Sequence, residues 1–384
     1  MNTVSLLISV GNRRVDDILR GVIGIFESVF PNRIRGYYLT GSYTDGTAVP
    51  ASDIDVDILF IDNFISLEEN EKAQQTSQNC SLMSPIPLEL NLYSEGQALR
   101  LGFPTLKFAS ILLYGEDVRD EIRLIPLDWY RRAAMHVPYR FYSRIRGKPE
   151  CLVFPLNYPD PEGQFYGYDK RKARDAVGTL RPGTKEIINC VGKSALAIIA
   201  FKANIYVNDK NDCLKQYRTR INDEWTDLIQ DVYAKCRRTW EYCVPEDTDD
   251  RKQLKNICER TLAFENYFLS LYKEFLLGEL ENVKVNSLWL SVTEAVGHIG
   301  FCEQRLRQKI ENGEIQSAIA HGEQLVLLEK ADRIWAAKAL GKVIYCDSEV
   351  VAALQALEND ENEELRHAAT ESLRKIQRVT RSNQ

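Results

Sequence analysis

The N-terminal third of the chain alternates between helical and strand-like patterns of apolar residues. Apolar positions recur at helical spacing over residues 14–30, which predicts an amphipathic helix. Residues 35–42 (RGYYLTGS) predict a short strand that ends in a Gly-Ser turn, and a loop rich in Gly, Pro, Ser and Thr follows. Residues 53–61 (DIDVDILFI) and 87–94 (PLELNLYS) then alternate strictly. Each predicts a strand with acidic or amide side chains on one face and Ile, Val or Leu on the other.

These elements predict a small mixed β-sheet in a head domain over residues 1–125. The expected order is helix, strand, loop, strand, a polar segment around residues 74–77, strand, and a helical stretch that ends at LLYGED (residues 112–117). Because helices dominate the rest of the chain, the fold class that we predict is α+β.

From about residue 127 the pattern becomes helical and basic. Long apolar-periodic runs cover residues 186–206 and 258–277, and they are typical of helices packed in a core. The interruption at residues 153–172 is rich in Pro, Gly and aromatic residues and predicts a loop. Aromatics beside cations can stack on nucleic-acid bases, but long loops usually pack through their own side chains. We therefore expect a basic helical domain over residues 126–284, and a nucleic-acid partner is not favoured.

The last hundred residues contain an internal repeat. Arg333, Ala336, Leu340 and Lys342 recur 33 positions later as Arg366, Ala369, Leu373 and Lys375. Each set lies on one predicted amphipathic helix, and the pattern resembles short bacterial HEAT repeats. Residues 294–300 (EAVGHIG) are the expected end of a third, weaker copy. Two clear copies are few for a free-standing solenoid, so we expect residues 285–384 to pack against the preceding helices.

Composition argues against several classes of protein. The sequence holds no run of about 18 apolar residues, so no membrane span is expected. The short apolar run at the N-terminus is not preceded by the basic residues of a secretory signal, which predicts a cytoplasmic protein. The nine cysteines form no C-x-x-C pair and the four histidines are far apart. Neither a disulfide framework nor a zinc or histidine-based metal site is therefore expected.

The net charge of −6 conceals an uneven distribution. Residues 1–120 carry nine Lys and Arg against sixteen Asp and Glu, whereas residues 130–260 carry twenty-five against eighteen. An acidic segment beside a basic one fits a metal site that faces a polyphosphate-binding surface. Solvated faces give the same pattern equally well, so charge alone does not decide the function.

The predicted strands place a set of oxygen ligands beside the Gly-Ser turn. Asp53 and Asp55 are two residues apart and project to the same side of a strand. Glu89 lies in the next alternating strand and can complete a cluster for two Mg²⁺ ions, which prefer oxygen ligands. Such a pair of ions stabilises the attacking and leaving oxygens of a nucleotidyl transfer. Glu89 can also take the proton from an acceptor hydroxyl. The Gly41-Ser42 turn lets backbone N–H groups approach the phosphates.

The stretch GSYTDGTAVPASDIDVDILF, in which Asp53 follows Gly41 by twelve residues, resembles the signature of the DNA polymerase β-like nucleotidyltransferase superfamily. It is most similar to the bacterial small-molecule branch, which includes aminoglycoside nucleotidyltransferases. The resemblance implies that Gly41 and Ser42 bind the triphosphate and that Asp53 and Asp55 hold the metals. It also implies that Glu89 is a metal ligand or general base. Asp57 lies one step beyond the motif, and we expect a hydrogen-bonded or solvated strand residue there.

Beyond residue 120 the resemblance becomes faint. Lys193 and Lys215 match in outline the lysines that such enzymes use on the triphosphate, and a lysine is a point charge suited to phosphate. The alternative is that both are ordinary surface residues, as most lysines are.

The leading hypothesis is an enzyme that moves a nucleoside monophosphate, AMP from ATP, to a hydroxyl of a small-molecule acceptor. A second hypothesis keeps this chemistry but uses a protein, nucleotide or RNA acceptor, and the basic domain and the HEAT-like tail give it weight. The tail presents a helical surface of a kind that often binds a protein partner. A third hypothesis is a non-catalytic nucleotide sensor, and the intact set of three acids argues against it.

Overall fold

The structure is a computed structural model that describes most of the chain. It covers residues 4–62, 64–100, 102–175, 177–281 and 331–382, the strand residues 289–291, 317–320 and 323–327, and residues 307, 308 and 310. Among these residues, no helix combines the length and apolarity that crossing a membrane requires. The chain separates into two compact units. The first comprises Met1–Tyr130, Tyr206–Asp212 and Leu288–Leu328, and the second comprises Arg131–Ile205, Cys213–Ser287 and Glu329–Gln384.

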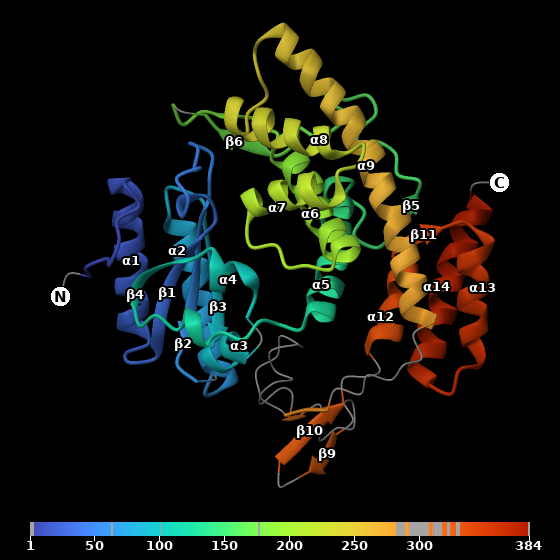
Figure 1. The fold of residues 1–384 in the computed structure, drawn as a ribbon, viewed down its shortest axis with the longest axis horizontal. Coiled ribbons are helices and arrows are strands. Elements are labelled where there is room, and N and C mark those ends of the chain that lie inside the picture. Colours follow the sequence, from blue (N-terminus) through green and yellow to red (C-terminus); the bar gives the residue numbers. More distant parts are fainter. Residues whose placement is uncertain are drawn as a thin grey trace. The chain divides into compact units, whose positions relative to one another are not determined.

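A four-stranded sheet forms the centre of the first unit (Figure 1). Its strand order is β3-β2-β1-β4, and the strands are β1 (Ile34–Thr40), β2 (Ile54–Phe60), β3 (Leu88–Ser94) and β4 (Ile111–Gly115). β1 pairs antiparallel with β2 and with β4, whereas β2 and β3 are parallel. The mixed sheet and the three predicted strands are therefore confirmed.

Helix α1 (Arg13–Val29) packs against one face of this sheet. The side chain of Asn12 accepts hydrogen bonds from the first N–H groups of α1 and so defines where the helix begins. The apolar face of α1, including Leu19 and Phe26, forms one core with the inward residues of the strands, including Val56. This core results from the helical and alternating periodicities of the sequence.

Two segments of the first unit differ from the prediction. The expected polar segment is helix α2 (Leu67–Met83), whose beginning is capped by Ser66. Only Ala73, Ser77 and Cys80 are buried in α2, so an apolar period is too weak to see in the sequence. The end of the expected helical stretch is instead strand β4, which pairs with β1, so that prediction is wrong. Shorter helices α3 (Glu95–Arg100) and α4 (Pro104–Phe108) precede it.

The second unit is largely helical. Its helices before residue 282 are α5 (Leu127–Ile145), α6 (Lys185–Ile198), η3 (Ile199–Ala203), α7 (Lys210–Gln216), η4 (Tyr217–Ile221), α8 (Thr226–Asp231), η5 (Val232–Thr239) and α9 (Thr248–Glu281). The first residues of α5 and of α7 belong to the first unit. The expected loop over 153–172 packs through its own side chains: Phe165 and Tyr168 are buried, and Tyr158 stacks on Tyr166. A short hairpin of β6 (Lys172–Arg174) and β7 (Leu180–Pro182) follows.

The C-terminal residues of this unit pack on α9. They form α12 (Ala331–Leu340), β11 (Val343–Tyr345), α13 (Ser348–Ala356), η6 (Leu357–Asn359) and α14 (Glu363–Ser382). β11 pairs in parallel with β5 (Leu152–Phe154), and α12 packs against α9. Residues 331–382 therefore pack on the preceding helices, whereas Leu288–Leu328 belongs to the first unit, so the predicted domain of residues 285–384 stays a prediction. The repeated Ala336 and Ala369 are buried on α12 and α14. The expected third copy lies outside the described residues.

A small antiparallel sheet of β8 (Trp289–Ser291), β10 (Glu323–Leu327) and β9 (Ser317–Ala320) completes the described elements. With its mixed sheet in the N-terminal head and a largely helical region after it, the protein has the predicted α+β class.

Candidate nucleotidyltransferase site

The predicted acids gather at one edge of the head sheet, where β1 ends and β2 and β3 begin. Asp53 directly precedes β2, and Asp55 is the second residue of that strand. In the parallel register of β2 and β3, Asp55 lies opposite Glu89. In the antiparallel register of β1 and β2, Asp55 lies opposite Thr40, the residue before the Gly-Ser turn. Asp55 therefore stands between the turn on one side and Glu89 on the other.

The turn touches Asp55 directly. Gly41 has a φ of +74°, a conformation that residues with a side chain rarely adopt. A Cβ atom added to Gly41 would lie 2.2 Å from Oδ2 of Asp55. Glycine is therefore required for two reasons, the left-handed backbone and the close approach of the carboxylate. Ser42 follows in the short helix η1 (Gly41–Tyr43) and is buried.

The loop between the turn and β2 is braced by its own side chains. The Asp45 carboxylate accepts hydrogen bonds from the backbone N–H of Thr47 at 3.0 Å and from its hydroxyl at 2.6 Å. The hydroxyl of Ser52, which is fully buried, accepts a hydrogen bond from the backbone N–H of Val49 at 2.9 Å. These local bonds give a loop rich in Gly, Pro, Ser and Thr a defined path into Asp53.

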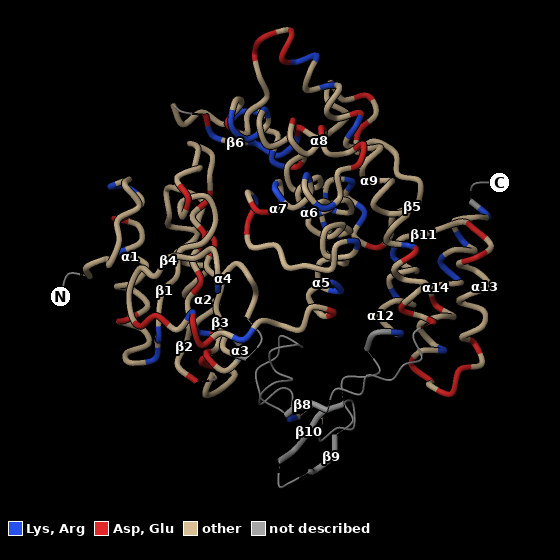
Figure 2. Tube along the Cα trace, viewed as in Figure 1, with Lys and Arg blue, Asp and Glu red and all other residues tan. Residues whose placement is uncertain are grey.

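The acids repel one another in a partly dry environment. Burial, together with the nearby Asp53, Glu89 and Asp57, raises the pKa of Asp55 to about 7 against the opposing effect of Lys210. Figure 2 shows the acidic residues that run along this sheet. Negative charge therefore outweighs positive charge around the carboxylate of Asp55.

Asp57 lies deeper along the same face of β2. Burial raises its pKa to about 6, and a hydrogen bond from the Asn91 side chain, at 3.0 Å, acts in the opposite direction. Asp57 is thus a hydrogen-bonded strand residue, which is the role expected from the sequence.

The chemistry of the donor set suits a hard divalent cation, because the acids supply only oxygen ligands and their mutual repulsion would be relieved by positive charge. Within the described ranges, no three His, Cys, Asp or Glu side chains are spaced so that they could hold a metal ion. Register and electrostatics thus bring the acids into one neighbourhood, although their side chains are not grouped as metal ligands in the part of the chain that is described.

Lys210 is a charged residue near Asp55 that sequence reasoning missed. It belongs to the segment Tyr206–Asp212, which returns to the first unit far along the chain from the sheet. Its positive charge opposes the rise in the pKa of Asp55, so it lies within electrostatic reach of the acids. The sequence around it, VNDKND, is rich in turn-forming Asn and Asp. In the structure Lys210 is the first residue of α7, and this Asn- and Asp-rich stretch was the available signal.

Lys193 and Lys215, the lysines that the sequence favoured, both belong to the second unit. Lys193 is exposed on α6, and Lys215 is exposed on α7. Their role at the triphosphate stays a prediction.

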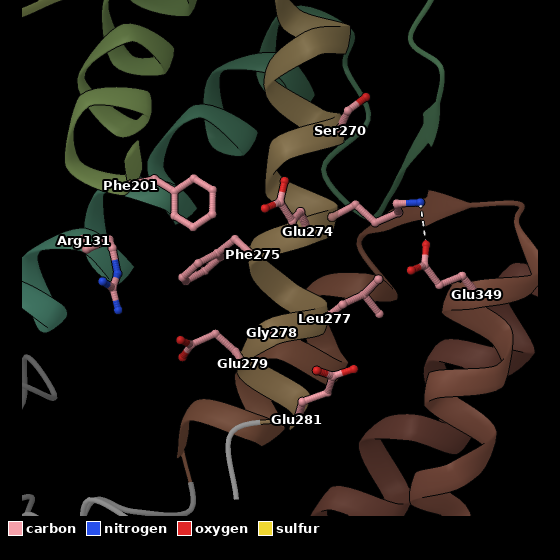
Figure 3. Close-up of a pocket in the computed structure, with 11 residues that line it drawn as sticks. Arg131, Phe201, Ser270, Glu274, Phe275, Leu277, Gly278, Glu279, Glu281 and Glu349 are labelled. Atoms are coloured by element: carbon pink, nitrogen blue, oxygen red, sulfur yellow. Dashed lines mark hydrogen bonds and ion pairs between the residues drawn. The ribbon is translucent and has the colours of Figure 1, made fainter. Parts of the chain in front are cut away.

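The second unit contains an open pocket of about 710 Å³ beside α9 (Figure 3). Three of its charged side chains are already paired: Lys273 and Glu349 lie 3.0 Å apart, and Glu279 lies 2.7 Å from Arg132. Arg131 and Phe201 line another side, and α9 contributes Phe275 and Leu277. None of the residues predicted for nucleotidyl transfer is among those that line it.

Part of the head is similar to a known protein family. Residues 19–92 match the family described as "Nucleotidyltransferase domain". The matched range contains β1, the Gly-Ser turn, β2 and all but the last two residues of β3. No curated protein is similar enough in sequence to be matched with the chain. Among solved structures, the chain is similar to spectinomycin adenyltransferase AAD(9) from Enterococcus faecialis, determined with ATP and spectinomycin. The TM-score is 0.39 at 12% identity, covering 65% of this chain and 98% of that one. The similarity to nucleotidyltransferase domains thus lies in the N-terminal residues that contain Asp53, Asp55 and Glu89.

Proposed function

We propose that the protein is a Mg²⁺-dependent nucleotidyltransferase that moves AMP from ATP to a hydroxyl of a small-molecule acceptor and releases pyrophosphate. The observation that carries the proposal is the position of Asp55, which has the Gly41 turn against its carboxylate and Glu89 opposite it in the neighbouring strand. The match of residues 19–92 to nucleotidyltransferase domains supports the same reaction class.

In the proposed site, Asp53, Asp55 and Glu89 hold two Mg²⁺ ions, which when bound would stabilise the attacking and leaving oxygens. Gly41 and Ser42 bind the triphosphate through the turn. A lysine charge on the phosphates would come from Lys210, and Lys193 and Lys215 are further candidates from the second unit.

The bond changes balance without a further reactant. The acceptor hydroxyl oxygen attacks the α-phosphorus, a new oxygen–phosphorus bond forms, and the bond from the α-phosphorus to the bridging oxygen of pyrophosphate breaks. The acceptor proton passes to the carboxylate of Glu89, whose side chain is exposed and therefore open to an acceptor.

For the tail we propose a HEAT-like surface that binds a protein partner. The repeat itself is supported by its equivalent positions on α12 and α14: Arg333 forms an ion pair with the Asp360 carboxylate at 2.9 Å, and Arg366 donates to the Asp360 backbone carbonyl at 2.6 Å. A protein bound to this surface would fit the alternative hypothesis, in which the acceptor is a protein.

The test follows labelled nucleotide. Purified protein is incubated with Mg²⁺ and each α-labelled NTP, with and without a small-metabolite extract, and label and pyrophosphate are measured. Label in small metabolites supports the proposal, whereas label on protein, on RNA or in new oligonucleotides supports the alternative acceptors. Nucleotide binding without turnover supports a sensor.

Asp53→Ala should reduce transfer by several orders of magnitude because it removes a ligand of the metal pair. The matched control is Glu71→Gln, which removes an exposed acid of the same head on α2. If Asp53→Ala retained the activity of Glu71→Gln, the proposed site would be wrong.

A further inference from the structure

The segment Tyr206–Asp212, here called the return segment, is fixed to the first unit by hydrogen bonds along its length. The hydroxyl of Tyr206 donates to the backbone carbonyl of Ile125 at 2.6 Å. The backbone N–H of Val207 donates to the hydroxyl of Tyr130 at 3.1 Å. The hydroxyl of Thr105 donates to the carbonyl of Asn208 at 2.9 Å. The return segment is thus part of the head in structure, although it lies far from the sheet in sequence.

Asn211, near the end of the return segment, bonds to the loop of residues 41–52. The side-chain amide of Asn211 donates to Oδ2 of Asp45 at 2.6 Å, across 166 positions of sequence. The other oxygen of Asp45 already accepts the two bonds from Thr47. Both carboxylate oxygens are therefore engaged, one by the loop itself and one by the return segment. Asp45 lies between the Gly41 turn and Asp53, so the bond holds the loop near its middle.

Lys210 directly precedes Asn211, and the positive charge of Lys210 acts on the carboxylate of Asp55. A tether at Asn211 therefore also restricts where the backbone of Lys210 can lie. One short hydrogen bond therefore joins the loop of residues 41–52 to Asn211, the residue that follows Lys210.

We propose that the Asn211–Asp45 hydrogen bond is a positioning contact that holds Lys210 and the loop of residues 41–52 in one arrangement, so that Asn211 increases the affinity for a nucleoside triphosphate by acting through Lys210. This inference rests on the proposed function, because it supposes that the loop binds a triphosphate. Its energetic source is preorganisation, since ordering that is already present in the free protein need not occur on binding.

The test is a double-mutant cycle on nucleotide affinity. The probe is α,β-methylene-ATP with Mg²⁺, measured by isothermal titration calorimetry on the full chain. Lys210→Ala should weaken binding about tenfold or more, and Asn211→Ala about three- to tenfold, the range expected for a solvent-exposed hydrogen bond to a charged group. The double variant should bind no more weakly than Lys210→Ala alone, because the two residues act as a unit.

Two further variants separate positioning from loss of structure. Asn211→Asp should weaken binding more than Asn211→Ala, since it places a second carboxylate against Asp45. Thr105→Val removes a different tether of the return segment without touching Asp45 or Lys210, and it should leave the affinity within about threefold of the wild type if the Asn211 contact is specific. Melting temperatures of all variants establish that each is folded.

Additive losses in the cycle, an unchanged affinity in Asn211→Ala, or an equal loss in Thr105→Val would each overturn the inference while the proposed function stands. Absence of nucleotide binding by the wild-type protein would instead refute the proposed function itself, and the inference with it.

Discussion

Replacement of Gly41 by alanine is a direct test of the contact on which the site depends. The new Cβ atom would lie 2.2 Å from Oδ2 of Asp55, whereas ordinary van der Waals contact begins at 3.4 Å. The turn or the carboxylate must therefore move by more than an ångström. In addition, the residue has a φ of +74°, so alanine is strained there whatever the space around it.

The same loop contains a matched control. Gly46 has a φ of +69°, and a Cβ atom added there would meet no atom within 4 Å. Alanine in the left-handed region costs about 1–2 kcal/mol, and the reduced freedom of the unfolded chain returns roughly 0.4–1 kcal/mol. Gly46→Ala should therefore lower the free energy of unfolding by about 1 kcal/mol, which lowers the melting temperature of a domain of this size by about 2–4 °C.

Gly41→Ala carries the same backbone cost and also displaces Asp55. A shift of about an ångström in a reacting group can reduce a rate about 100-fold. We expect Gly41→Ala to reduce nucleotide transfer by about this factor, and Gly46→Ala to change it by less than about threefold because it leaves the carboxylate in place. The assays are urea denaturation and the release of pyrophosphate from ATP under identical conditions. Equal losses of transfer in the two variants would refute the argument, because backbone strain alone would then explain both.

Three further predictions follow from the same side-chain environments. The pKa of Asp55 is raised to about 7 from an ordinary value of 3.8, so its protonated form is favoured by folding; without divalent cations, its contribution to stability is present below about pH 4 and is lost as the pH rises towards 7. Melting curves in EDTA should therefore show that the melting temperature of Asp55→Asn rises relative to that of the wild type between pH 5 and pH 8. An equal difference in melting temperature at both pH values would contradict this. Glu89→Gln should reduce the transfer rate by about 10²–10⁴, the usual contribution of a general base, and single-turnover kinetics measures it; retention of the wild-type rate would exclude Glu89 from proton transfer. In the second unit, Arg146 Nη2 lies 2.5 Å from Glu265 Oε2, and both side chains are buried. Glu265→Ala should therefore lower the free energy of unfolding by about 3–5 kcal/mol in urea, whereas Glu259→Ala, at a more exposed site on the same helix, should cost less than about 1 kcal/mol.

Much of the head could be predicted from the sequence, because its strands have one buried and one acidic face. The alternation in β2 and β3 is strict, and it placed Asp55 and Glu89 on one face before their register was known. β4 was missed because it is an edge strand of five residues, and its apolar run has no alternation to distinguish it from a helix. α2 was missed because it is almost entirely polar.

Lys210 could not have been predicted by the same means. Its place beside the acids depends on hydrogen bonds that join positions about 80 to 170 residues apart, such as Tyr206 to Ile125 and Asn211 to Asp45. Periodicity reports which face of an element is buried, but it contains no information about which distant segment covers that element. The sequence analysis therefore chose Lys193 and Lys215, and it passed over Lys210, which begins the same helix α7 that contains Lys215.

The acidic edge of the sheet implies that stability and ligand binding are linked in this protein. Asp55 is partly buried among three other acids, and the charge that opposes them in the described structure is that of Lys210. A divalent cation that binds the folded chain and not the unfolded one would stabilise it by mass action, by an amount that grows with the logarithm of the cation concentration. Because the acids must be ionised to bind the cation, this stabilisation should increase with pH. It would therefore oppose the loss of stability that ionisation of Asp55 causes in the cation-free protein. The same carboxylates would then lower the stability of the cation-free protein at neutral pH and raise the stability of the cation-bound protein.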